Sequence, residues 1–178
     1  SCAPKYITGD GPDVAADYGE EYLSWVVPMR SIIEGGVMAV FEIDTHAVAG
    51  EGVFFHIGQY VNRMGKDGKV LDEDQKINRT WAMKTATSWA SYYVLKENDL
   101  GTLEKGKFAD FIVLNKNYFD EDNLPDAMIK TVRPLLTVIG GHIRYLDTGL
   151  ASELKTEPQG IQPEQVIRTI HQWESEAM

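Results

Sequence analysis

The sequence predicts a mixed α/β fold, and three local patterns carry this prediction. Apolar residues recur at helical spacing along residues 51–64, which indicates an amphipathic helix. Residues 37–43 form a nearly continuous apolar run of strand length, as in parallel strands that are buried on both faces. Residues 131–146 contain two apolar stretches around Gly140-Gly141, a composition typical of a two-residue hairpin turn.

The start of the chain, residues 1–19, has three Gly and two Pro and is expected to be a loop or an ordered arm. Residues 20–34 carry apolar side chains near helical spacing, but Pro28 interrupts them, which predicts two short helical pieces or a kinked helix. Gly35 and Gly36 are expected to end the second piece, because glycine adopts the left-handed cap conformation at low cost.

Two more helices are expected before the chain changes character at residue 101. Asp72 can cap one that begins at about residue 73, and residues 88–95 predict another. The aromatic residues of this region are expected to lie in the core: Trp81, Trp89, Tyr92 and Tyr93.

The later part of the chain predicts strands at residues 108–114, 131–139 and 142–146. Pro134 lies within the second of these stretches, which places that stretch at a sheet edge or beside a bulge. The tail is polar from residue 148 until Pro163, where a short amphipathic helix is expected to begin.

Composition excludes several classes of protein. The 178 residues include 17 Lys plus Arg and 27 Asp plus Glu, a formal net charge of −10 that argues against a nucleic-acid partner. The longest apolar run, residues 37–41, is far shorter than the roughly 20 residues that span a bilayer. Cys2 is the single cysteine, so neither a disulfide framework nor a cysteine-based zinc site is expected.

Asp44 is the first candidate for chemistry. It directly follows the apolar run 37–43, and folds with parallel strands place catalytic groups at the carboxyl ends of those strands. A carboxylate there can bind a divalent metal ion or take a proton from water. The alternative is a loop aspartate that caps the next turn.

The four histidines are weaker candidates. His46 lies two residues after Asp44 and could contact a substrate, but two ligands do not make a zinc site. His56 lies on the predicted helix 51–64 and is expected to pack there, whereas His142 and His171 are expected at the surface.

One motif changes this assessment. Residues 99–114 read DLGTLEKGKFADFIVL, in which Gly101 and Gly106 permit tight turns on either side of Leu103. Leu103 is expected to be buried beneath the following strand, and Asp110 to bind backbone amides at the strand entry.

This stretch resembles the signature near the C-terminus of the amidohydrolase superfamily of metal-dependent hydrolases, in its family 3-like branch. The flanking segments resemble the family in the same order. Residues 81–90 are similar to the helix before the motif, residues 132–145 to the closing hairpin, and residues 28–44 to the last helix and final strand of the barrel.

The resemblance implies a (β/α)8 barrel with one or two metal ions, usually zinc, flanked by a small β-sandwich. Of the implied metal ligands, only the aspartate of the last strand maps onto this chain, at Asp44, where it would also accept the proton of the attacking water. The implied His-x-His, midway Lys or Glu and two further His are not matched, so no cofactor is expected to bind tightly to this chain alone.

Length adds to what the resemblance implies. A complete barrel takes about 250 residues, with about 200 as the lower end, so a chain of 178 residues is expected to be a C-terminal fragment. The expected division is residues 1–98 as terminal barrel elements with the last barrel strand, residues 99–147 as β-sandwich strands, and residues 148–178 as a tail with an amphipathic helix.

The implied function is that of a metal-dependent amidohydrolase, which cleaves non-peptide carbon–nitrogen bonds of a small amide or cyclic ureide by metal-activated water. The isolated chain is expected to be inactive and to form homo-oligomers through strand edges; the compartment stays open, with the cytoplasm favoured. The segment EIDTH at residues 42–46 departs from the usual Gly-Ser-Asp-x-Pro. That departure supports an alternative, a non-catalytic binding or assembly module derived from the family.

Overall fold

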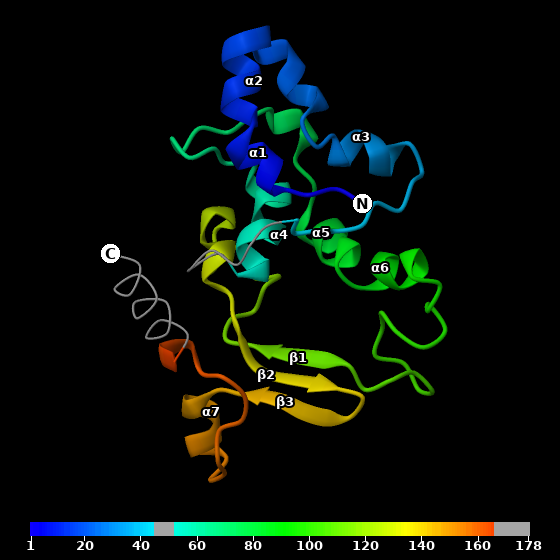
Figure 1. The fold of residues 1–178 in the computed structure, drawn as a ribbon, viewed down its shortest axis with the longest axis vertical. Helices are drawn as coiled ribbons and strands as arrows, with labels where there is room; N and C mark the ends of the chain where they lie inside the picture. Colours follow the sequence, from blue (N-terminus) through cyan, green and yellow to red (C-terminus); the bar gives the residue numbers. More distant parts are fainter. Residues whose placement is uncertain (45–51, 166–178) are drawn as a thin grey trace, which may run out of the picture. The chain divides into compact units, whose positions relative to one another are not determined.

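The computed structural model describes residues 1–44 and 52–165 and contains two compact units (Figure 1). Unit 1 comprises Ser1–Thr102 and Asn117–Val132, and unit 2 comprises Leu103–Lys116 and Arg133–Met178. The helices of unit 1 are α1 (Lys5–Gly9), α2 (Gly11–Tyr18), η1 (Glu20–Trp25), α3 (Met29–Glu34), α4 (Val53–Asn62), η2 (Glu73–Gln75), α5 (Arg79–Thr85), α6 (Ser88–Tyr93) and η3 (Asp126–Thr131). Unit 2 contains β1 (Phe111–Leu114), β2 (Pro134–Ile139), β3 (His142–Leu146) and α7 (Thr148–Glu153). The mixed α/β class is therefore as expected.

The start of the chain is helical, so the expectation of a loop or arm over residues 1–19 was wrong. Pro4 precedes α1 and Pro12 stands in the first turn of α2, where proline is tolerated because the first helical N–H groups have no partner within the helix. Ile7 is fully buried and anchors α1 to the unit. The prolines therefore mark helix starts here.

The next segment confirms the prediction of two helical pieces. The 3₁₀ helix η1 and helix α3 lie on either side of Pro28, which is the N-cap of α3. Gly35 caps α3 at its C-terminus, and Gly36 has a φ of 85°, in the left-handed region that glycine favours.

The apolar run 37–43 makes one parallel bridge, between Phe41 and Cys2, instead of a longer ladder. The Cys2 N–H donates to Val40 O at 2.9 Å, and the Glu42 N–H donates to Cys2 O at 3.2 Å. Val37 is 58 % exposed, so the prediction of burial on both faces was wrong for the start of this run. Residues 2 and 41 thus lie side by side and parallel, and α1 to α3 connect them in the manner of a crossover.

Helix α4 is the centre of unit 1 and confirms the amphipathic helix expected from the sequence. Seven of its ten residues are buried. The Tyr60 hydroxyl donates to Cys2 O at 2.5 Å, which attaches the parallel bridge to α4. The expectation that the aromatic cluster lies in the core was wrong for α6, because Tyr92 is 50 % and Tyr93 64 % exposed.

Arg79, at the start of α5, ties the segment 117–132 to the rest of unit 1. Its side chain is 3 % exposed, and its Nη1 donates to Tyr118 O at 2.7 Å. Its Nη2 donates to Leu124 O and, at 2.7 Å, to Asp126 Oδ1, which also accepts from Nε at 3.0 Å. One guanidinium group therefore pairs with two backbone carbonyls and a carboxylate that are 39 to 47 residues away in sequence.

Unit 2 is built on an antiparallel sheet with strand order β1-β2-β3. Gly140 and Gly141 join β2 to β3 with φ values of 58° and 78°, the signs that a two-residue turn of type I′ requires. Asp110 Oδ1 accepts from the Gly140 N–H at 2.6 Å. Asp110 thus binds a backbone amide, but the amide belongs to the hairpin turn 30 residues later and not to the strand entry, where it was expected. Leu103 is 75 % exposed, and the prediction of its burial was wrong.

Pro134 begins β2 and pairs with Leu114, and the register shifts between Val113 and Leu114. Of the two expected settings for this proline, the sheet edge was wrong because β2 is the central strand, whereas the register shift agrees with a bulge. A proline fits the first position of a strand because its missing N–H then costs no inner bond of the ladder.

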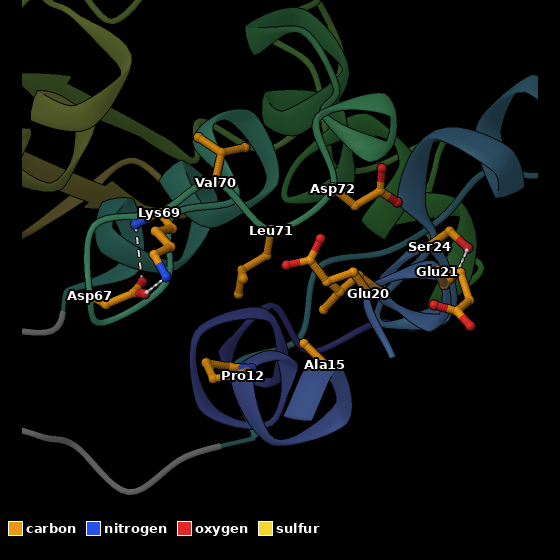
Figure 2. A pocket seen from close by; sticks show the side chains of 11 residues that line it. Pro12, Ala15, Glu20, Glu21, Ser24, Asp67, Lys69, Val70, Leu71 and Asp72 are labelled. Carbon is orange, nitrogen blue, oxygen red and sulfur yellow. Dashed lines mark hydrogen bonds and ion pairs between the residues drawn. The ribbon is translucent and has the colours of Figure 1, made fainter. Parts of the chain in front are cut away.

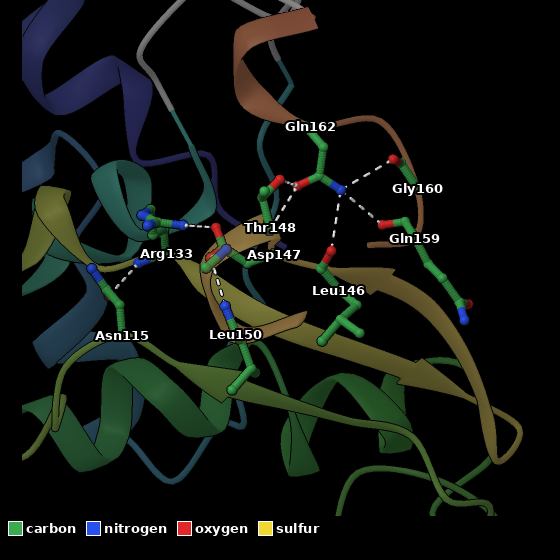
Figure 3. Close-up of polar contacts among 10 residues, drawn as sticks. Asn115, Arg133, Leu146, Asp147, Thr148, Leu150, Gln159, Gly160 and Gln162 are labelled. Carbon is green, nitrogen blue, oxygen red and sulfur yellow. Dashed lines mark hydrogen bonds and ion pairs between the residues drawn. The ribbon is translucent and has the colours of Figure 1, made fainter. Parts of the chain in front are cut away.

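The tail is fastened to β3 by the backbone bridge between Gln159 and Leu146 and by the side chain of Gln162 (Figure 3). Gln162 Nε2 donates to the carbonyls of Leu146, Gln159 and Gly160 at 3.1 to 3.2 Å. Its Oε1 accepts from both the N–H and the hydroxyl of Thr148 at 3.2 Å. Residues 163–165 are helical, as expected from Pro163, and the remainder of that predicted helix lies outside the described residues.

Candidate functional site

Asp44 stands three residues after Phe41, at the carboxyl end of the segment that bridges to Cys2. Its side chain is about half exposed, at 51 %, and its backbone has a φ of 46°. A positive φ is uncommon for a residue other than glycine, although aspartate is among those that tolerate it best. The carboxylate therefore lies at the surface where the extended segment ends.

Two side chains of α1 converge on Asp44. The Tyr6 hydroxyl donates to Asp44 Oδ2 at 2.8 Å, and Lys5 Nζ lies 3.2 Å from the same oxygen. Lys5 Nζ also donates to the backbone carbonyl of Asp44. The hydrogen bond from Tyr6 and the bond and charge of Lys5 together hold the pKa of Asp44 below its usual range. Asp44 is thus ionised at neutral pH.

The same interaction changes the acidity of the tyrosine. The hydrogen bond to Asp44 raises the pKa of the Tyr6 hydroxyl, since loss of its proton would place two negative oxygens side by side. Lys5 Nζ lies 4.9 Å from the centre of the Tyr6 ring, in the range of a cation–π contact. Tyr6 therefore remains a hydrogen-bond donor at neutral pH.

A cavity of about 310 Å³ adjoins this group of residues. Lys5 and Tyr6 form part of its wall, together with Thr8, Gly9, Asp10, Phe55, His56 and Lys66. The volume is at the lower end of the range for small-molecule sites. A small molecule in this cavity would meet the two side chains that hold Asp44.

The histidines are distributed as follows. His56 is 1 % exposed on α4, with its ring edge-on to Phe55 at 5.2 Å, so its predicted packing role is confirmed. His142 is exposed at the start of β3, as expected. His46 and His171 lie outside the described residues, and the suggested contact of His46 with a substrate stays a prediction.

A catalytic zinc site needs at least three protein ligands. Within residues 1–44 and 52–165, no group of three or more His, Cys, Asp or Glu side chains could hold a metal ion. Asp44 offers one carboxylate, and the ammonium group of Lys5 already pairs with it. The described residues therefore do not by themselves form a metal centre.

A second cavity, of about 420 Å³, lies between α2, η1 and residues 67–72 of unit 1 (Figure 2). Pro12, Ala15 and Leu71 supply apolar walls, and the carboxylates of Glu20 and Asp72 are among its polar lining. Sequence reasoning placed residue 72 only as a helix cap, and Asp72 Oδ1 does accept from the Asp74 N–H. The helix it caps is only η2, however, because α5 begins separately at Arg79 with Asn78 as its cap, so the expected continuous helix from residue 73 was wrong.

Arg63 connects the end of η1 and the residues after it to Leu71. Its side chain is 1 % exposed and donates to Leu71 O at 2.6 Å, to Val26 O at 2.9 Å and to Val27 O at 3.0 Å. Burial lowers the pKa of Arg63 to about 10, so its charge persists at neutral pH. The guanidinium group satisfies carbonyls of two loops at once.

Sequence reasoning identified Asp44 and missed Lys5 and Tyr6. Asp44 was found because it follows an apolar run, which is a local signal. Its partners lie 39 and 38 residues earlier in a stretch that was expected to be a loop. The one available signal was the position of Lys5 and Tyr6 directly after Pro4, at the start of a helix.

Comparison with models of protein families relates this chain to a known family. A model described as the amidohydrolase family matches residues 2–145, a range that includes Asp44 and the motif at residues 99–114. No curated protein matches the sequence. Among the helices in the described parts of the chain, none has the length and apolar character needed to cross a membrane.

Proposed function

The chain belongs to the amidohydrolase family, and from that premise we propose that it is the C-terminal part of a metal-dependent hydrolase. The bonds it cleaves are carbon–nitrogen bonds other than peptide bonds, in small amides or cyclic ureides. Asp44 is the residue that this chain supplies to the active site.

One observation carries the proposal. Asp44 follows Phe41 by three positions, and Lys5 and Tyr6 follow Cys2, the parallel partner of Phe41, by three and four positions. In folds made of parallel strands, active sites lie at the carboxyl ends of neighbouring strands. An ionised carboxylate and two donors from the adjacent segment meet at such a place here.

The role proposed for Asp44 is proton transfer together with metal ligation. Its low pKa keeps the carboxylate ionised, the form that both accepts a proton from the attacking water and binds a cation. The metal, which we propose to be zinc, needs further ligands, and these would come from parts of the enzyme outside the described residues.

The proposed architecture follows from the family. Residues 1–98 would be terminal elements of a barrel, residues 99–147 strands of a β-sandwich, and residues 148–178 a tail. The parallel bridge of Cys2 and Phe41 supports the first part, and the antiparallel sheet β1-β2-β3 supports the second. We also propose self-association through strand edges, because Ile112 and Val113 on β1 are 46 % and 41 % exposed.

The test uses the complete gene product. Its metal content is measured, and its activity is assayed against a panel of amides, cyclic ureides and esters. Asp44→Asn is expected to lower kcat by at least about 100-fold, the lower end for loss of a general base. Asp17→Asn, an exposed aspartate on α2, is the matched control and is expected to retain full activity.

Two outcomes would contradict the proposal. Equal activity of the Asp44→Asn variant and the wild type would remove Asp44 from the site. Failure of the complete, metal-loaded protein to cleave any member of the panel would instead favour a non-catalytic binding or assembly module.

A further inference from the structure

We propose that Tyr6 and Lys5 are positioning residues of the active site, which hold the Asp44 carboxylate in a single orientation. The inference rests on the role proposed for Asp44 and adds two residues to that site. It is carried by the geometry of α1 relative to the parallel bridge.

Both donors reach the same carboxylate oxygen. The Tyr6 hydroxyl is 2.8 Å from Asp44 Oδ2, and Lys5 Nζ is 3.2 Å from it. Lys5 Nζ also donates to the carbonyl of Asp44, which fixes the backbone at the same point. The hydrogen bond from Tyr6 and the ion pair with Lys5 both end on Oδ2, and Oδ1 is the oxygen that would act on a reacting group in the proposed site.

The scaffold behind these contacts is well anchored. The bridge between Cys2 and Phe41 stands three residues before Lys5 and three residues before Asp44, so both segments leave the bridge together. Tyr60 holds the carbonyl of Cys2 from α4. Ile7, one residue after Tyr6, is fully buried. The position of α1 relative to Asp44 is therefore set by interactions outside the site.

The partial exposure of Lys5 and Asp44 argues that their contacts serve to orient the Asp44 carboxylate. The side chains of Lys5 and Asp44 are 33 % and 51 % exposed, and ion pairs in such settings contribute little to stability. Two donors on one oxygen do, however, restrict the rotation of a short side chain. Small displacements of reacting groups are costly in catalysis, so the value of these contacts lies in the geometry of Asp44.

The first experiment measures kinetics in the complete hydrolase. Tyr6→Phe removes one oxygen and is expected to lower kcat about tenfold or more, while KM stays within about twofold. Lys5→Met is expected to act in the same direction, and Lys5→Arg to restore most of the lost kcat. Tyr18→Phe and Lys96→Met are the matched controls, an exposed tyrosine on α2 and an exposed lysine paired with Asp99, and are expected to keep wild-type kinetics.

The second experiment needs no activity. Three-bond NMR couplings report the side-chain rotamer of Asp44 in this chain. One rotamer is expected in the wild type, and averaged couplings in the double variant Lys5→Met, Tyr6→Phe, with an unchanged melting temperature because the contacts are exposed.

The two readouts separate the possible failures. Unchanged Asp44 couplings in the double variant would overturn the inference whatever the activity. Averaged couplings together with a wild-type kcat would show that catalysis does not depend on the orientation of Asp44, and would overturn the inference. Averaged couplings in a protein that hydrolyses nothing would support the positioning by Tyr6 and Lys5 while the proposed function fails.

Discussion

Replacing Arg79 by methionine tests how segment 117–132 is held in unit 1. The substitution keeps an unbranched apolar stem but removes the guanidinium group. Tyr118 O and Leu124 O would lose their donor, and Asp126 would lose its ion pair. The side chain is 3 % exposed, so water cannot easily replace these bonds.

The expected loss can be worked out from these contacts. Each buried carbonyl left without a donor costs about 1–3 kcal/mol. Asp126 is 49 % exposed, so its pair adds at most about 1 kcal/mol. Removing the guanidinium group also removes the cost of burying its charge, and this gain offsets part of the lost stability. The free energy of unfolding should therefore fall by about 3 kcal/mol, a large share of the roughly 5–15 kcal/mol of an ordinary domain.

Urea denaturation measures this loss, and hydrogen exchange locates it. Amides of residues 117–132 should lose protection first, because Arg79 is their link to α5. Arg79→Lys should recover less than half of the stability, since an ammonium group lacks the planar fork. Arg30→Met, which breaks an exposed pair with Glu34, is the control and should cost about 0.5 kcal/mol. A loss below about 1 kcal/mol for Arg79→Met would refute this reasoning.

Three further predictions concern the motif, the sheet and the tail. Gly101→Ala should destabilise the fold by about 2 kcal/mol and Gly106→Ala by about 1 kcal/mol, as measured by thermal melting. Both glycines have a positive φ, which alanine adopts at a cost. Of the two, only residue 101 would also bring the added Cβ close to a side-chain carbon, at 2.8 Å. The hydrogen bond from Arg133 lowers the pKa of Asp147 below 3.8, so this pair stabilises the fold above that pH and its contribution is lost as pH falls through the lowered pKa. Urea midpoints at pH 6 and pH 3 should therefore differ less in Asp147→Asn than in the wild type, and an equal difference would contradict this. Gln162→Ala should raise protease cleavage within residues 154–162 and leave the melting of the sheet nearly unchanged; unaltered cleavage would show that other contacts hold the tail.

The hairpin was predictable almost residue by residue. Gly140-Gly141 fixes the turn, and the apolar residues on either side fix the strands, so the relevant information is local. Helix α4 was predictable for the same reason, from one apolar stripe.

Other elements depended on distant partners. The apolar run 37–43 has the composition of a strand, but a strand exists only where another segment pairs with it. Among the described residues, the run forms a single bridge, with Cys2, and a backbone hydrogen bond from Phe41 to Thr85 O. Helix α1 is stabilised by burial of Ile7, which no pattern within residues 1–19 reveals. The same limit applies to the site. Asp44 could be found from its own neighbours, whereas its contacts with Lys5 and Tyr6 exist only after the chain has folded back.

The contacts between the tail and β3, including those of Gln162, affect which edge of the sheet can pair with a further strand. Gln159 bridges to Leu146 and occupies the outer rim of β3 at that end, while no strand in the described part of unit 2 lies along the outer rim of β1. The outer edge of β1 could therefore pair with a further strand, from the same polypeptide or from a neighbour. At the Leu146 end of β3, the tail already occupies the corresponding position.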